Sequence, residues 1–192
     1  AGGKIVPYLD MPLQHTEDEM LRAMRRRGNQ AHIRGILEYV ETHAPEFMLR
    51  TTLMVGFPGE TDALFSRMLR FIREHPFDRV GAFAFSAEEG TAAASLPNQV
   101  PEEVRQERLQ ILMEAQREIS RARNERRIGQ TVEVLVEGMD GARAYGRSYA
   151  EAPDVDGKVY LTNAADLPAG TFVSVRLTQA GEYDMFSERL PL

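Results

Sequence analysis

A predicted strand, a Gly-Phe-Pro-Gly turn and a predicted helix follow one another in this chain and constrain its fold more than any other feature. Residues 48–55 are apolar or β-branched, as in a buried strand, and the turn at 56–59 separates them from a helix that begins near Thr61. In α/β proteins such a turn lies at the carboxyl end of a parallel strand, where ligands usually bind. We therefore expect Glu60 to project from the rim of a sheet, although a tight turn with an exposed glutamate would give the same pattern.

Strands and helices alternate over the first 86 residues. Thr16 and Glu19 form a capping-box pair at the start of one helix, and Gly28 marks its end after three arginines. These arginines complement the helix terminus, or one of them faces a ligand. The order predicts an α/β fold with parallel strands. Its elements are a strand at 8–13, helices at 16–28 and 31–43, a strand at 48–55, a helix at 61–74 and a strand at 79–86.

A long helix, expected over 102–128, ends the α/β part, and the apolar periodicity changes directly after it. From Gly129 onward apolar residues recur at every second position between turn pairs such as Asp140-Gly141. Several short strands in so few residues are typical of a small barrel of the oligonucleotide-binding kind. We therefore predict two domains, 1–128 and 129–192. The second is a five-stranded antiparallel β-barrel with strands at 131–136, 142–148, 158–161, 172–178 and 183–189.

Charge is distributed unevenly between these domains. The formal net charge of the chain is −6, and residues 129–192 account for −5 of it, with five basic and ten acidic residues. A barrel that bound RNA phosphates would be expected to be basic. An acidic barrel favours a basic protein partner, or a solvated surface with no charged partner. We expect most barrel aromatics to lie in its core or at its edges; they are Tyr145, Tyr149, Tyr160, Phe172, Tyr183 and Phe186.

The sequence shows no signal for a membrane or a self-contained metal site. No apolar run approaches the roughly 18 residues of a membrane span, and the first residues contain no signal-peptide core, so a cytoplasmic address is the default. There is no cysteine, which excludes disulfides and thiolate-held clusters built by these residues. The four histidines are scattered, and only His15 follows a strand end. We expect a monomer.

Three motifs stand out by their order and barrel-like spacing: Tyr8-Leu-Asp-Met-Pro-Leu-Gln-His15, Arg50-Thr-Thr-Leu-Met-Val-Gly-Phe-Pro-Gly-Glu60 and Phe85-Ser-Ala-Glu-Glu-Gly-Thr91. Together they resemble the last strands of the radical S-adenosylmethionine domain of the methylthiotransferases. The resemblance implies that residues 1–128 are the C-terminal portion of a partial, TIM-like (β/α) barrel with a long final helix. The closing barrel resembles the TRAM domain of that family.

Two segments of the closing barrel narrow the resemblance further: Gly146-Arg-Ser-Tyr-Ala-Glu-Ala-Pro-Asp-Val-Asp-Gly157 and Glu182-Tyr-Asp-Met-Phe186. They are similar to the branch of the family that methylthiolates an aspartate of a small-subunit ribosomal protein. In that branch one 4Fe-4S cluster reductively cleaves S-adenosylmethionine, the resulting radical takes a hydrogen from the aspartate β-carbon, and a second 4Fe-4S cluster delivers sulfur.

The resemblance also implies roles for particular residues. Val55, Gly56 and Phe57 would pack near the adenine of S-adenosylmethionine. The other candidate contacts to cofactor or substrate are the polar groups of Asp10, Gln14, Thr52 and Glu60, with Phe85 and Ser86 at the tip of the last strand.

The absence of cysteine is a departure from the family, because this chain cannot ligate either cluster through thiolates. We therefore expect a fragment of a longer enzyme, without methylthiotransferase activity by itself. Its acidic TRAM barrel would dock the basic ribosomal protein, and nucleic acid would not be the main partner. The alternatives are a fragment of a tRNA-modifying methylthiotransferase and a non-catalytic RNA-binding module.

Overall fold

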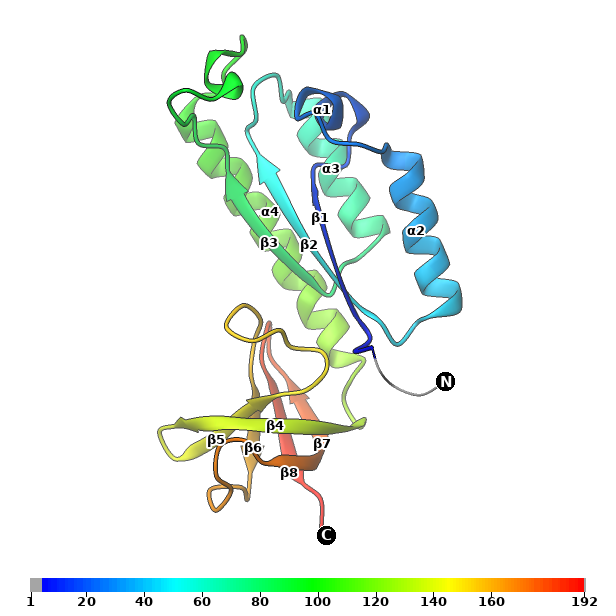
Figure 1. Cartoon of the computed structure of the whole chain (residues 1–192), viewed down its shortest axis with the longest axis vertical. Helices are drawn as coiled ribbons and strands as arrows, with labels where there is room; N and C mark the ends of the chain where they lie inside the picture. Colours follow the sequence, from blue (N-terminus) through cyan, green and yellow to red (C-terminus); the bar gives the residue numbers. More distant parts are fainter. Residues whose placement is uncertain (1–4, 192) are drawn as a thin grey trace. The chain divides into compact units, whose positions relative to one another are not determined.

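The computed structural model describes residues 5–191, which form two compact units (Figure 1). The first unit comprises Leu9–Gln116, and the second runs from Arg117 to the end of the described chain and includes Tyr8. Helix α4 (Glu102–Glu125) contributes residues to both units. Within residues 5–191, no helix is long and apolar enough to cross a membrane.

The first unit is built on a three-stranded sheet with the order β1-β2-β3. β2 and β3 are parallel, with Arg50 opposite Arg79 and Val55 opposite Ala84, so their carboxyl ends lie at one edge. The predicted α/β class and element order are confirmed. The elements are β1 (Tyr8–Gln14), α1 (Asp18–Ala23), α2 (Gln30–His43), β2 (Met48–Val55), α3 (Asp62–Glu74), β3 (Arg79–Ala84) and the short 3-10 helix η1 (Ala92–Ser95).

An apolar core joins the helices of the first unit to its sheet. Ile33, Leu37 and Val40 recur along one face of α2 and pack in one cluster with Leu49 of β2 and Phe71 of α3. Complete burial of an apolar side chain of this size contributes about 1.5–3 kcal/mol. The helical periodicity seen in the sequence therefore becomes the packing that holds the sheet.

Helix α1 begins later than the sequence pattern predicted. It starts at Asp18, its N-cap is Glu17, and no side chain caps it, so the predicted capping box of Thr16 and Glu19 is wrong. Thr16 is fully buried, and its hydroxyl lies 3.5 Å from a carboxylate oxygen of Glu17. Tertiary burial has removed this threonine from the helix start that its local sequence favours.

Helix α1 also ends earlier than predicted, at Ala23 instead of near Gly28. Arg25 adopts a left-handed φ of +55°. The N–H groups of Arg25 and Arg26 donate to the carbonyls of Arg22 (3.0 Å) and Leu21 (2.8 Å), which is the hydrogen-bond pattern of a Schellman motif. An arginine thus occupies the position that glycine usually takes.

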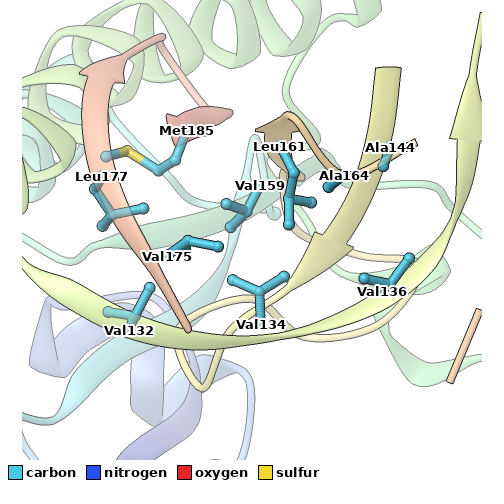
Figure 2. Close-up of a cluster of buried hydrophobic side chains, with 10 residues drawn as sticks. All are labelled: Val132, Val134, Val136, Ala144, Val159, Leu161, Ala164, Val175, Leu177 and Met185. Atoms are coloured by element: carbon cyan, nitrogen blue, oxygen red, sulfur yellow. The ribbon is translucent and has the colours of Figure 1, made fainter. Parts of the chain in front are cut away.

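The second unit contains a closed five-stranded barrel with the order β4-β5-β6-β8-β7. Alternate residues point inward, and they fill the barrel with Val, Leu, Ala and Met side chains (Figure 2). The predicted small barrel is confirmed. Its strands are β4 (Thr131–Asp140), β5 (Arg143–Arg147), β6 (Val159–Thr162), β7 (Phe172–Ala180) and β8 (Met185–Arg189).

One strand pair of the barrel departs from the antiparallel arrangement that we predicted. β6 and β8 are parallel, with Val159 opposite Met185 and Thr162 opposite Glu188, whereas the other four pairs of the described barrel are antiparallel. β7 lies between them in the sequence but pairs with β4 and β8. Two chain reversals therefore bring β8 beside β6 in the same direction.

The second unit is less acidic than its barrel alone. Residues 117–192 contain ten basic and twelve acidic residues, a net charge of −2, because residues 117–128 add five arginines and only two glutamates to the barrel. The arginines of residues 117–128 therefore offset more than half of the net charge of −5 that residues 129–192 carry. Charge steering by this unit is correspondingly weaker than the barrel sequence suggested.

Candidate functional site

A pocket of 330 Å³ lies at the carboxyl ends of β1 and β2, which is where the sequence predicted a ligand site. Its volume is at the lower end of the range for small-molecule sites, which is about 300–1,000 Å³. Apolar and polar groups both reach it. The lining residues are Gln14, Ala23, Met24, Arg25, Arg26, Met54, Phe57, Ala92, Ala93 and Leu96.

Phe57 lines this pocket and belongs to a cluster of buried apolar side chains. The rings of Phe57 and Phe85 meet edge to face with centroids 5.2 Å apart, and both side chains are 6% exposed. Met20 and Leu64 complete their cluster. Two of the predicted site residues are therefore in direct contact, and one of them lines the pocket.

The turn after β2 is held tightly by α4. Gly56 has a φ of +73°, and a Cβ placed there would lie 2.2 Å from Cγ of Arg105. The Arg105 guanidinium donates to the carbonyl of Phe85. Only glycine satisfies both the backbone conformation and the close approach. Gly56 thus serves packing against Arg105 and does not leave open space for a ligand at its own Cα.

Glu60 is not at the rim of the sheet, so this prediction is wrong. The side chain is fully buried, and Oε1 accepts hydrogen bonds from the N–H of Gly56 (2.9 Å) and from the guanidinium of Arg108 (2.8 Å). The other oxygen, Oε2, lies 3.2 Å from Nε2 of His15. A buried carboxylate requires such partners, because an unpaired charge in the interior is costly.

His15 has a definite tautomer in this arrangement. The backbone N–H of Glu17 donates to its Nδ1 at 3.0 Å, so the proton of the neutral ring lies on Nε2 and is donated to Glu60. His15 therefore connects the end of β1 to the turn after β2. The sequence placed it beside a strand end but gave no indication of this partner.

The remaining candidate residues are distributed unevenly around the strand ends. Val55 is fully buried, and its carbonyl accepts the N–H of Phe85 at 2.9 Å. Thr52 is half-buried in β2, whereas Asp10, 43% exposed, accepts a hydrogen bond from Arg50 at 2.5 Å. Ser86 is exposed and donates to Glu88 at 2.9 Å. Neither Asp10 nor Ser86 lines the pocket.

Two residues of the pocket, Arg25 and Arg26, were not among the candidate site residues. The sequence offered two interpretations of the three arginines: they complement the end of the helix, or one of them faces a ligand. The Arg26 guanidinium donates to the carbonyl of Pro12 at 2.5 Å. Within residues 5–191 the Arg25 side chain forms no hydrogen bond or ion pair, and it is exposed at the pocket. Arg25 differs from the neighbouring arginines by its positive φ, which is uncommon at a non-glycine residue. The sequence could not identify it, because a backbone angle is not visible in a sequence.

The outer surface of the barrel carries a second candidate site. Tyr145, Tyr160 and Phe186 occupy directly paired positions on β5, β6 and β8 and are half-buried on the outside. The rings of Tyr160 and Phe186 stack at 5.5 Å, and Nζ of Lys158 lies 4.1 Å from the ring centroid of Tyr145. We expected most barrel aromatics to lie in the core or at its edges; these three are half-buried and lie outside the core cluster of the barrel.

Two of the three carboxylates in the acidic segment 151–157 accept hydrogen bonds from groups within the same unit. The Glu151 side chain is 1% exposed, and its carboxylate accepts hydrogen bonds from Arg127 (2.6 Å) and from the Ser148 hydroxyl (2.6 Å). Burial by itself raises the pKa of Glu151, but Arg127 and Ser148 outweigh it and hold that pKa below its ordinary value. Asp156 accepts the N–H of Ala152 at 2.9 Å. Asp154 is the exposed carboxylate of the segment.

Comparisons with known proteins agree with both parts of this structure. Residues 128–190 match the TRAM domain family. The chain is 50% identical over 182 residues to ribosomal protein uS12 methylthiotransferase RimO of Desulforudis audaxviator, covering 95% of this chain and 40% of that protein. Proteins of the same name from Nostoc sp. (46% identity, 96% and 42% covered) and Acetivibrio thermocellus (44%, 96% and 41%) are also similar.

The closed barrel and its family match define the class: this is an α/β chain that carries a TRAM domain. Over nearly its whole length the chain corresponds in sequence to the TRAM-containing part of RimO-type proteins. It spans about two-fifths of the length of the relatives that it matches.

Proposed function

We propose that this chain supplies strand ends that bind S-adenosylmethionine, together with the TRAM barrel, in a radical methylthiotransferase. The protein substrate, called the client below, would be ribosomal protein uS12, and the methylthio group would be added to the β-carbon of one of its aspartates. The observation that carries the proposal is the 50% identity over 95% of this chain to a protein named for that activity. The pocket at the carboxyl ends of β1 and β2 supports it.

The residues of the pocket fit an adenosyl ligand. Phe57, Met54 and Leu96 offer apolar surface for a flat ring. Bound S-adenosylmethionine would supply the radical chemistry that opens the client's C–H bond. The residues of this chain would hold and orient it, with Gly56 and the buried Glu60 fixing the turn that carries Phe57.

Iron–sulfur clusters do not fit the residues of this chain. The chain contains no cysteine, and the described residues contain no group of three or more His, Asp or Glu side chains arranged to hold a metal. We propose that both 4Fe-4S clusters of the enzyme are ligated by residues outside this chain. This chain alone would then be inactive as a methylthiotransferase.

A chimera tests the proposed reaction. The segment of the Desulforudis audaxviator relative that matches this chain is replaced by the 192 residues, and methylthiolation of uS12 is followed by mass spectrometry. A chimera that assembles its clusters and methylthiolates uS12 supports the proposal. A chimera that assembles its clusters, binds S-adenosylmethionine and leaves uS12 unmodified contradicts it.

We also propose that the TRAM barrel binds the basic client. Exposed carboxylates such as Asp154 and Glu133 support this role, but the net charge of −2 for residues 117–192 limits the expected electrostatic contribution. Titration of the full chain with uS12 at increasing salt tests it, because screening weakens exposed charge pairs. Binding that is absent, or that does not respond to salt, would remove this part of the proposal.

The outer aromatic row favours a second candidate function, which is binding of single-stranded RNA. Bases stack on aromatic side chains without regard to sequence, and the row of Tyr145, Tyr160 and Phe186 offers three such side chains. The net charge of the unit opposes this candidate. A gel shift of RNA by the chain that is lost in Tyr160→Ala would favour it over protein docking.

A further inference from the structure

The pocket at the strand ends contains two residues in a backbone conformation that their side chains disfavour. Among residues 5–191, the non-glycine residues with positive φ are Gln14, Arg25, Asn98, Asp154 and Asn163. Asn and Asp adopt this conformation with comparative ease, but Gln and Arg do not. Both exceptions, Gln14 at +69° and Arg25 at +55°, line the same pocket. Such residues concentrate at ligand sites because a local cost is maintained for function.

The cost at Arg25 has no compensation from contacts of its side chain. Arg25 is the left-handed residue of the Schellman motif that ends α1, where glycine would be free of steric conflict. No hydrogen bond or ion pair of its guanidinium is found within the described residues. Arg26, in contrast, donates to the carbonyl of Pro12. Arg25 is therefore the pocket cation that is available to a ligand.

The pocket favours an anion by composition. Two arginines line it, and none of its ten lining residues is acidic, although the chain as a whole has a net charge of −6. The Gln14 amide lines the same pocket, and its side chain likewise has no hydrogen-bond partner in the described part of the chain. A guanidinium binds a planar carboxylate through two parallel hydrogen bonds, and an amide N–H can add a third.

We propose that Arg25, assisted by Gln14, binds the side-chain carboxylate of the client aspartate and so selects an acidic residue for modification. This inference rests on the proposed function, because it assigns the anion site to the client of that reaction. The aspartate β-carbon is bonded directly to the carboxylate carbon. A residue that fixes the carboxylate therefore also fixes the position of the reacting β-carbon, and an asparagine side chain would lose the charge-assisted pair.

Binding of small probes to the intact 192-residue chain tests the proposal without iron–sulfur clusters. N-acetyl-L-aspartate amide, N-acetyl-L-asparagine amide and S-adenosylmethionine are titrated separately, and the NMR signal of the Arg25 guanidinium Nε–H is followed. We expect the aspartate probe to bind at least about tenfold more tightly than the asparagine probe, since one charge-assisted hydrogen bond accounts for a difference of this size.

Arg25→Gly gives the sharpest variant, because it removes the guanidinium and relieves the backbone at the same time. We expect affinity for the aspartate probe to fall at least about tenfold while the thermal midpoint stays the same or rises. Arg27→Gly removes the same charge two residues away, outside the pocket lining, and should leave probe binding unchanged. Asn163→Gly relieves a positive φ in the barrel and should also leave it unchanged.

Two outcomes would overturn the proposal. The intact chain could bind the aspartate and asparagine probes equally or bind neither. Arg25→Gly could keep its affinity for the aspartate probe; if it lost S-adenosylmethionine at the same time, the cation would be assigned to the carboxylate of the cosubstrate. A chimera that fails to methylthiolate uS12 while selective aspartate binding persists would count against the proposed reaction and not against this subsite.

Discussion

The imidazole of His15 and the carboxylate of Glu60 meet at 3.2 Å although the two residues are 45 positions apart in the sequence, and both side chains are completely buried. Glu60 also accepts hydrogen bonds from Gly56 and Arg108, so one carboxylate joins the end of β1, the turn after β2 and helix α4. The hydrogen bonds of the buried Glu60 therefore hold in place the turn that positions Phe57 at the pocket.

Glu60→Gln should destabilise the first unit strongly. The amide keeps the shape of the side chain but leaves the buried Arg108 guanidinium without its carboxylate, although Asp62 still contacts it at 2.6 Å. Removing one partner of a buried ion pair costs about 3–5 kcal/mol. We expect urea denaturation to show a loss near the lower end of this range. The control Glu41→Gln, on the exposed side of α2, should change the free energy of unfolding by less than about 0.5 kcal/mol; equal losses in both variants would contradict the buried role of Glu60.

Three glycine-to-alanine variants should separate backbone strain from steric conflict. Gly56→Ala meets both a positive φ and the Arg105 side chain at 2.2 Å, whereas Gly59→Ala meets a positive φ of +88° with open space around it. We expect Gly59→Ala to cost about 1 kcal/mol and Gly56→Ala clearly more. Gly35→Ala, inside α2 with no atom within 4 Å, should stabilise by about 0.5–1 kcal/mol. Thermal unfolding of the three proteins gives the order, and a Gly56→Ala protein as stable as Gly59→Ala would disprove the close approach of Arg105.

The stability of the second unit should fall at acid pH through Glu151. Its folded pKa is below the ordinary value, so the stabilisation is present above the unfolded pKa of about 4.3 and is lost as pH falls through the folded value. Thermal midpoints between pH 7 and pH 3 should therefore drop more for the natural chain than for Glu151→Gln. The variant should already be destabilised at pH 7, because Arg127 loses its buried partner. Parallel pH profiles would show that Glu151 does not contribute.

Asp140→Asn should lower the pKa of Tyr160. The Tyr160 hydroxyl donates to Asp140 at 2.9 Å, and this hydrogen bond, with the negative charge of Asp140, raises the pKa of the phenol above its ordinary value. NMR titration of the Tyr160 ring carbon follows the change directly. Glu133→Gln, on β4, removes one negative charge from the same barrel without touching Tyr160 and serves as the control. An unchanged pKa in Asp140→Asn would mean that the hydrogen bond is not formed in solution.

The elements were predictable where a local pattern and the tertiary packing agree. The apolar face of α2, the helix start at Thr61 and the strand at 48–55 follow from periodicity and capping, and the structure confirms each of them. Helix α1 was not predictable in the same way. Its local signals pointed to Thr16 and Gly28, but burial of Thr16 and the Schellman motif at Arg25 moved both ends inward.

A pocket does lie at the strand ends, but only two of the nine candidate residues, Gln14 and Phe57, line it. Glu60, in contrast, is an interior group, because His15 and Arg108 arrive from distant segments to satisfy its charge. Local sequence gives no measure of such long-range pairing.

By itself the sequence determined the alternation of strands and helices, the change to a two-residue period at Gly129 and the glycines of the turn, because each depends on neighbouring residues and on the conformations they allow. Only the tertiary structure decided that Glu60 is buried, that β8 runs parallel to β6 and that Arg25 lines the pocket. These depend on which remote groups can reach one another. That is a property of the packed chain, since charges and hydrogen-bond donors are satisfied in three dimensions regardless of their separation in sequence.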